Sequence, residues 1–124
     1  MNAVKTFEDL LAWQEAHKLV LMTYHITKAF PAEEKYGLVS QMRRAAISVP
    51  ANVAEGFRRY GLQEKIRFYN ISEASLEELR YYLILSRDLN YIEENQPLIA
   101  QAEQVGRLLS GLIASTSRRK PPAA

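Results

Sequence analysis

The stretch Gln41–Arg59, with the sequence QMRRAAISVPANVAEGFRR, decides the fold that this chain is predicted to adopt. Apolar residues in it and just before it recur every three or four positions, which is the spacing of one face of an α-helix. They are Val39, Met42, Ala46, Val49, Val53 and Phe57. Pro50 removes one backbone hydrogen bond from such a helix, but the apolar pattern continues beyond it. We therefore expect one helix over about 35–59, kinked at Pro50, with two shorter helices as the alternative.

Three more segments with helical spacing flank this stretch, and no alternating pattern typical of β-strands competes with them. They cover about 9–29, 62–89 and 96–115. Thr6 and Asp9 form a capping arrangement before the first of these helices. Asn95 is the expected cap of the last helix, and Pro97 falls in its first turn, where its missing N–H costs little.

Short connections between long helices place sequential helices side by side and antiparallel. We therefore expect an all-α fold: an antiparallel, up-down-up-down four-helix bundle over 1–117, followed by a disordered basic and proline-rich tail over 118–124. Gly106 and Gly111 lower the helix propensity of the last segment. We expect both glycines to be compensated by close approach to a neighbouring helix.

Composition restricts the class of protein further. The chain has 124 residues, 48% of them hydrophobic and 24% charged, as in an ordinary globular domain. It has no cysteine, which excludes disulfides, thiolate metal ligands and a cysteine nucleophile. No apolar run is long enough to cross a bilayer, and the first residues lack the layout of a signal peptide. We expect a cytoplasmic protein with no membrane contact.

No motif of a catalytic, cofactor or metal site is found in the sequence. Di-metal four-helix bundles use Glu-x-x-His pairs, but His17 and His25 follow Gln14 and Met22 at that spacing. A lone histidine on an apolar seam is more often a core or interface residue than a haem ligand, which is how we interpret His17. The five glycines do not cluster into a phosphate-binding loop. We predict that the protein is not an enzyme and has no cofactor, metal or small-molecule substrate.

The charges are unevenly distributed although the net charge is only +2. Seven basic and two acidic residues fall between 35 and 67, whereas two basic and seven acidic residues fall between 68 and 103. Guanidinium groups suit phosphate because their planar forks donate paired hydrogen bonds, and Tyr60 and Tyr69 could stack on unpaired bases. The candidate residues for binding RNA or DNA are Arg43, Arg44, Arg58, Arg59, Lys65 and Arg67. The alternative is a solvated or intersubunit face, with ion pairs from Glu55 to Arg59 and from Glu64 to Arg67.

Five consecutive apolar residues interrupt the pattern of the third helix. Because such a run points in every direction around a helix, a single bundle would leave some of these side chains in water. A second interface removes this exposure, so we predict a homo-oligomer. The candidate interface residues are Tyr81, Tyr82, Ile84 and Leu85.

Three motifs resemble those of a bacterial family of four-helix-bundle proteins encoded in intervening sequences of 23S ribosomal RNA genes, also called the S23 ribosomal protein family. They are the stretch over 41–59, FEDLLAWQEAHKL over 7–19 and FYNISEASLEELRYYL over 68–83. The departures are small, since the family often has isoleucine where Val53 stands and glycine where Ala74 stands. The resemblance implies a bundle that often assembles as a homopentameric ring. It also implies kinship with the accessory protein of diversity-generating retroelements, a basic pentamer that binds nucleic acid and reverse transcriptase.

The central motif also has a structural interpretation. Backbone groups freed by Pro50 need hydrogen-bond partners, which Ser48, Asn52 and Glu55 lie close enough to supply. Two functions remain open from the sequence. One is a non-enzymatic, oligomeric adaptor that binds nucleic acid, and the other is a protein-interaction scaffold whose charged segments serve only oligomerisation.

Overall fold

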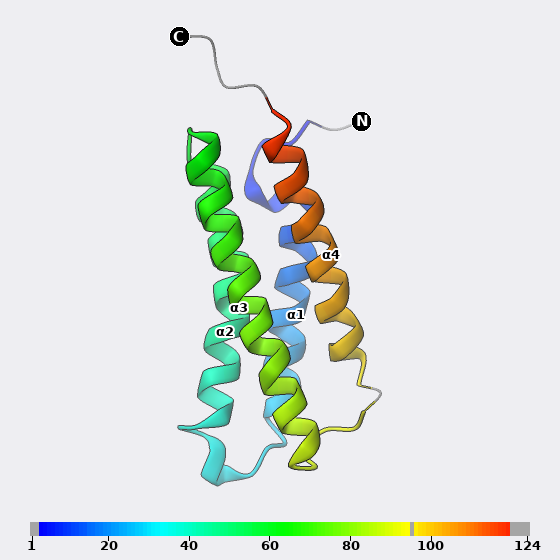
Figure 1. The fold of residues 1–124 in the computed structure, drawn as a ribbon. Coiled ribbons are helices and arrows are strands. Elements are labelled where there is room, and N and C mark those ends of the chain that lie inside the picture. Colours follow the sequence, from blue (N-terminus) through cyan, green and yellow to red (C-terminus); the bar gives the residue numbers. More distant parts are fainter. Residues whose placement is uncertain (1–2, 95, 120–124) are drawn as a thin grey trace.

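Four long helices dominate the fold in a computed structural model, which describes residues 3–94 and 96–119 and has no strand within those ranges (Figure 1). The helices are α1 (Leu11–Thr27), α2 (Leu38–Arg58), α3 (Leu62–Asp88) and α4 (Pro97–Ser117). Helix α1 packs against α2 and α4, and α3 packs against the same two helices. Successive helices run in opposite directions (Figure 1), so the fold is the predicted up-down-up-down four-helix bundle.

The core is formed by one buried stripe from each helix. Ala16 and Leu19 of α1, Val49 and Val53 of α2 and Leu79 of α3 are fully enclosed. On α1 the stripe that contains Ala12, Ala16, Leu19 and Thr23 is buried, whereas Leu10, Trp13 and Val20 beside it are partly buried against the core. His17 is exposed, so its assignment to the core is wrong, while its place in an interface stays a prediction. Its ring stacks on Trp13 instead, with 5.1 Å between the ring centroids.

Helix α2 is one unbroken helix that contains Pro50, so the alternative of two short helices is wrong. The kink at this position stays a prediction. Pro50 is buried, and the residues next to it in α2 take part in a network of hydrogen bonds. Asn52 Nδ2 donates hydrogen bonds to the carbonyl oxygen of Ser48 at 2.8 Å and to Ser48 Oγ at 2.9 Å. Two of the three residues expected to support the proline motif therefore share one network.

This network continues onto α3 through serines that the sequence did not single out. Ser48 Oγ lies 2.7 Å from Ser75 Oγ, and Ser72 Oγ donates to the carbonyl oxygen of Val49 at 2.7 Å. Ser72 is fully buried. Glu55, the third expected member, is exposed and pairs with Arg59 instead. The motif therefore joins α2 to α3.

Close packing between helices requires glycine at Gly56, and at Gly106 a neighbouring helix lies within ordinary contact distance. A Cβ atom at Gly56 would lie 2.6 Å from Tyr69 Cε1 and 3.1 Å from the carbonyl oxygen of Lys65. A Cβ atom at Gly106 would lie 3.5 Å from Leu76 Cδ2, which confirms the expected approach of α3 and α4 there. For Gly111, no atom of the described residues lies within 4 Å of such a Cβ, so the same expectation is wrong there.

The helix boundaries differ from the expected ones where short 3-10 turns intervene. The capping box of Thr6 and Asp9 is present, but it caps the start of the turn η1 (Phe7–Asp9), and α1 begins only at Leu11. The turn η2 (Ala32–Glu34) likewise delays the start of α2. Pro97 opens α4 as expected. The expected cap Asn95, and residues 120–124 of the expected tail, lie outside the described residues.

Candidate nucleic-acid interface

Basic side chains gather at one end of the bundle. We call it the α2–α3 end, because it carries the turn over 59–61 between these helices, and the described first residues and the end of α4 lie there too (Figure 1). Its basic residues are Lys5, Arg58, Arg59, Lys65, Arg67, Arg118 and Arg119, and its acidic residues are Glu8, Asp9, Glu55 and Glu64. Segments that are far apart in the sequence therefore contribute positive charge to one place.

Two arginines flank one phenylalanine at this end. The Cζ atoms of Arg59 and Arg67 each lie 4.6 Å from the ring centroid of Phe68. Arg59 also pairs with Glu55 at 3.2 Å, and Arg67 forms a bidentate pair with Glu64 at 2.9 and 3.3 Å. The hydrogen bond from Arg67 lowers the pKa of the Glu64 carboxyl group. The two guanidinium groups are thereby held in defined positions while they stay exposed.

Lys65 has a structural role at the same end. Its ammonium group donates to the carbonyl oxygen of Phe57 at 2.6 Å and to that of Gly56 at 3.4 Å. These are carbonyl groups of the last turn of α2, where a cation is favoured by the helix dipole. Burial and, to a smaller extent, the positive charge of Arg119 lower the pKa of Lys65. Lys65 therefore closes α2 and presents less of its charge to the solvent.

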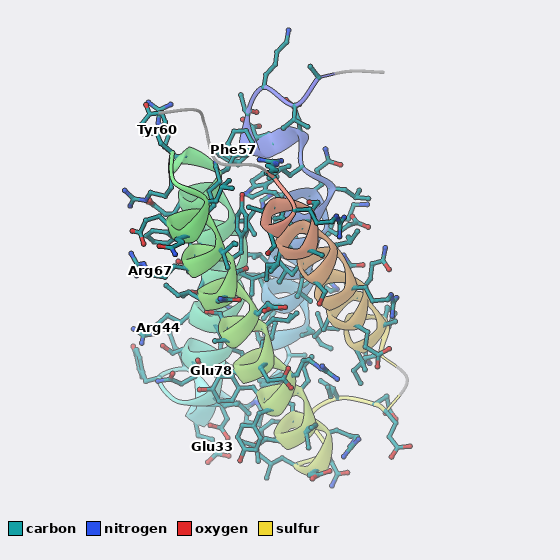
Figure 2. The ribbon with its side chains drawn as sticks, turned by 45° about the horizontal axis from the view of Figure 1, so that its top comes forward. Glu33, Arg44, Phe57, Tyr60, Arg67 and Glu78 are labelled. Carbon is teal, nitrogen blue, oxygen red and sulfur yellow. The ribbon has the colours of Figure 1, made fainter. Side chains whose placement is uncertain are left out.

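Arg58 and Tyr60 both have exposed side chains at the turn. Arg58 is exposed and makes no ion pair within the described residues. Tyr60 is 87% exposed and lies at the tip of the molecule (Figure 2). Tyr69 is only 2% exposed, so the prediction that it stacks on unpaired bases is wrong. Burial of this ring against Gly56 raises the pKa of Tyr69.

The predicted pair Arg43 and Arg44 lies elsewhere. Arg43 Nε donates to Thr27 Oγ1 at 3.0 Å, and its Cζ lies 4.5 Å from the ring centroid of Tyr24, so this guanidinium joins α2 to α1. Arg44 is exposed about 21 Å along α2 from Arg58, given the helical rise per residue. Figure 2 shows Arg44 well below the tip that carries Tyr60. Of the six predicted residues, the structure brings four together and separates this pair from them.

The predicted interface residues on α3 divide in a similar way. Tyr81 is 57% and Ile84 48% exposed, whereas Tyr82 and Leu85 are partly buried. Tyr82 donates a hydrogen bond from its hydroxyl to Glu78 at 2.6 Å, which raises the pKa of Tyr82. Ile84 borders a groove between α3 and α4 whose charged rim includes Arg80, Arg87 and Glu103. Apolar surface therefore does remain exposed on α3.

The described residues do not form a metal site or a membrane span. No three histidine, aspartate or glutamate side chains in that part of the chain come together in a way that could hold a metal ion. None of the helices within it combines the length and the apolar character that a membrane span requires. The basic α2–α3 end is thus the candidate site that the geometry singles out.

Fold and charge together define a class, a small all-α four-helix bundle with one basic end. The chain belongs to the 23S rRNA-intervening sequence protein family, whose model matches residues 8–111. This match confirms the resemblance drawn from the motifs. A crystal structure of a protein of unknown function from the S23 ribosomal protein family of Bacteroides thetaiotaomicron VPI-5482 is similar, with a TM-score of 0.77 at 19% identity. The similarity covers 83% of this chain and 98% of that chain. No curated protein matches the chain.

Proposed function

We propose that this protein is a non-enzymatic, oligomeric adaptor that binds RNA or DNA through its α2–α3 end. The observation that carries the proposal is the convergence of basic residues from distant segments on that end. Arg58 and Arg67 come from the two helices of the turn, and Arg118 and Arg119 come from the end of α4. Convergent guanidinium groups are the usual means by which proteins contact phosphate.

The exposure of these groups supports the proposal. Within the described residues, Arg58, Arg118 and Arg119 are exposed and make no ion pair. Arg59 and Arg67 are paired with glutamates, but each guanidinium has five N–H donors and the pairs use only some of them. The end can therefore donate to several phosphate oxygens without first breaking its own contacts.

The remainder of the molecule favours one orientation on a polyanion. The opposite end, formed by the connections over 28–37 and 88–96, is acidic on balance within its described part. It contains five acidic residues, Glu33, Glu34, Asp88, Glu93 and Glu94, and two basic residues, Lys28 and Lys35. An extended phosphate backbone is repelled there and attracted at the α2–α3 end. A bound strand would accordingly meet the basic end of each bundle.

Charge reversal at each end tests this function. Binding of a fluorescently labelled RNA or DNA strand would be measured by anisotropy at several salt concentrations. The double variant Arg58→Glu with Arg118→Glu should bind at least about tenfold more weakly, and its salt dependence should become shallower by about one unit for each lost phosphate contact. The control is Lys28→Glu with Lys35→Glu, which changes the net charge equally at the opposite end. Equal affinity of both variants, or no binding by the wild type at low salt, would contradict the proposal.

A second candidate function is a protein-interaction scaffold in which the charges serve only assembly, as a homopentameric ring or another homo-oligomer. The exposed Tyr81 and Ile84 favour this candidate, because apolar side chains of this size gain from a partner surface. Light scattering after gel filtration separates the two. The change Ile84→Glu should dissociate the oligomer in either case. Arg58→Glu should dissociate it only if the basic end is itself the subunit interface.

A further inference from the structure

The turn between α2 and α3 presents one aromatic side chain to the solvent on a fixed backbone. Tyr60 lies on this turn with 87% of its surface exposed. The backbone on both sides is held, since the Arg59 N–H donates to the Gly56 carbonyl at 3.2 Å and the Lys65 N–H to the Gly61 carbonyl at 3.0 Å. The Lys65 ammonium, from the first turn of α3, donates a hydrogen bond to the Phe57 carbonyl oxygen at the end of α2. A flat ligand could therefore stack on Tyr60 without ordering the loop first.

Phosphate-binding groups lie on both sides of this ring in the sequence. Arg58 and Arg59 precede Tyr60, and Arg67 lies further along α3, where its guanidinium shares the Phe68 ring with that of Arg59 (Figure 2). Within Arg67, Nε and Nη2 are occupied by Glu64, and in Arg59 Nη2 is occupied by Glu55. The remaining N–H groups can donate to an incoming anion. An exposed aromatic ring on the same turn as Arg58 and Arg59 matches the chemistry of one base and its flanking phosphates.

The molecule contains a matched tyrosine that lacks this setting. Tyr36 is also 87% exposed and also lies in a connection between helices. Its neighbours include Glu33 and Glu34, and the Lys35 ammonium lies 5.4 Å from the centroid of its ring. A phosphate beside Tyr36 would meet one ammonium group, and two carboxylates lie two and three residues earlier in the chain. Exposure alone therefore does not distinguish the two tyrosines, but their surrounding charge does.

We infer that the α2–α3 end recognises unpaired nucleotides, with Tyr60 stacking on a base and Arg58, Arg59 and Arg67 contacting the adjacent phosphates. This inference rests on the proposed function and narrows its ligand to single strands. In a duplex each base is already stacked on its neighbours, and separating one step costs a few kcal/mol. No helix within the described residues runs across this turn to enter a groove of a duplex, because α2 ends there and α3 begins there. Single-stranded RNA and single-stranded DNA share the required chemistry.

The experiment uses one strand in two states. An RNA strand of about 15 nucleotides is measured alone and annealed to its complement, and the same sequence is measured as DNA. We expect the single strand to bind more tightly than the duplex in at least one of the two chemistries. The change Tyr60→Ala should weaken single-strand binding about 5- to 100-fold and leave duplex binding unchanged. The change Tyr60→Trp should preserve single-strand binding, since the larger ring also stacks.

Tyr36→Ala is the control, because it removes an equally exposed tyrosine at the opposite end. It should leave the affinity for both strands unchanged. Equal affinity of Tyr60→Ala and wild type for single strands would overturn the inference, as would duplex binding at least as tight as single-strand binding. In both results the wild type still binds nucleic acid, so the proposed function survives. Absence of binding to every strand would instead refute the proposed function itself. Thermal unfolding of each variant shows whether the bundle is intact.

Discussion

The two ends of this bundle differ in how their charged groups are used, although each presents one highly exposed tyrosine. At the end opposite the α2–α3 end, charges connect segments of the protein. Glu34 accepts a hydrogen bond from the Tyr91 hydroxyl at 3.0 Å and another from the Leu38 N–H at 3.4 Å. One carboxylate thus joins the α3–α4 connection to the start of α2. At the α2–α3 end, by contrast, Lys65 alone closes a helix, and the arginines keep N–H groups free for a ligand.

An exposed aromatic residue indicates a binding site only together with the charges around it. Tyr36 and Tyr60 are indistinguishable by exposed fraction. Tyr36 follows Glu33, Glu34 and Lys35 in the chain, whereas Tyr60 follows Arg58 and Arg59, so a polyanion should discriminate between them. The two ends are held together by different contacts, so substitutions at each end should change the stability of the protein by different amounts.

The largest effect on stability is expected from Gly56→Ala at the α2–α3 end. The new methyl group would lie 2.6 Å from the Tyr69 ring and 3.1 Å from backbone, so α2 and α3 must separate there. Overpacking of this kind costs about 1–3 kcal/mol, and we expect the upper part of that range from urea unfolding. Gly111→Ala is the control, because its methyl group meets nothing within 4 Å. It should stabilise the protein by up to about 1 kcal/mol. A loss of stability of similar size in both variants would contradict the claim that close helix packing requires Gly56.

A smaller effect is expected from Lys65→Met. The change keeps the apolar stem but removes the donor to the carbonyl groups of Phe57 and Gly56, at a cost of roughly 1 kcal/mol. Lys35→Met at the opposite end removes an equal charge from an exposed side chain and should stay within about 0.5 kcal/mol of the wild type. The free energies of unfolding of the two variants decide the matter. If Lys65→Met matched Lys35→Met, the closing role of Lys65 would be wrong.

The smallest effect is expected at high pH. The hydrogen bond to Glu34 raises the pKa of Tyr91 above its ordinary value of 10.0. Because the folded state holds this proton more tightly than the unfolded state, the contribution is fully present below about pH 10 and is lost as the pH rises further. Tyr91→Phe should therefore lower the midpoint of urea unfolding near neutral pH. Above about pH 10 the midpoint of the wild type should fall more steeply with pH than that of the variant, because only the wild type loses this contribution. An identical alkaline decline in both proteins would show that this bond contributes nothing.

Much of the fold could be predicted from the sequence because helical periodicity is a local property. The spacing of Met42, Ala46, Val49 and Val53 is sufficient to define the buried face of α2 on both sides of the proline. Helix boundaries were less accurate, since 3-10 turns use residues that also suit an α-helix. Gly111 shows a second reason. A glycine in a helix can mark close packing, but only the rotation of that helix decides whether a neighbour is present.

The candidate site was predictable only in part, because it depends on how the helices are rotated. Arg59 and Arg67 come together since an antiparallel pair with a short turn must bring them close. The inward direction of Tyr69 depends on the space left by Gly56, and that of Arg43 on Tyr24 in another helix. The contribution of Arg118 and Arg119 requires α4 to close the bundle. The directions of Tyr69 and Arg43, and the contribution of Arg118 and Arg119, do not follow from spacing along the chain.

The hydrogen bond from Lys65 to the carbonyl oxygen of Phe57 has a consequence for the order of folding. It joins residues only eight positions apart, and the Ser72–Val49 and Ser48–Ser75 bonds extend the same pairing step by step along α2 and α3. Closing such short loops costs little chain entropy. We therefore expect the α2–α3 hairpin to form in the transition state, with α1 and α4 joining afterwards. Substitutions in the serine network should then slow folding more than they accelerate unfolding.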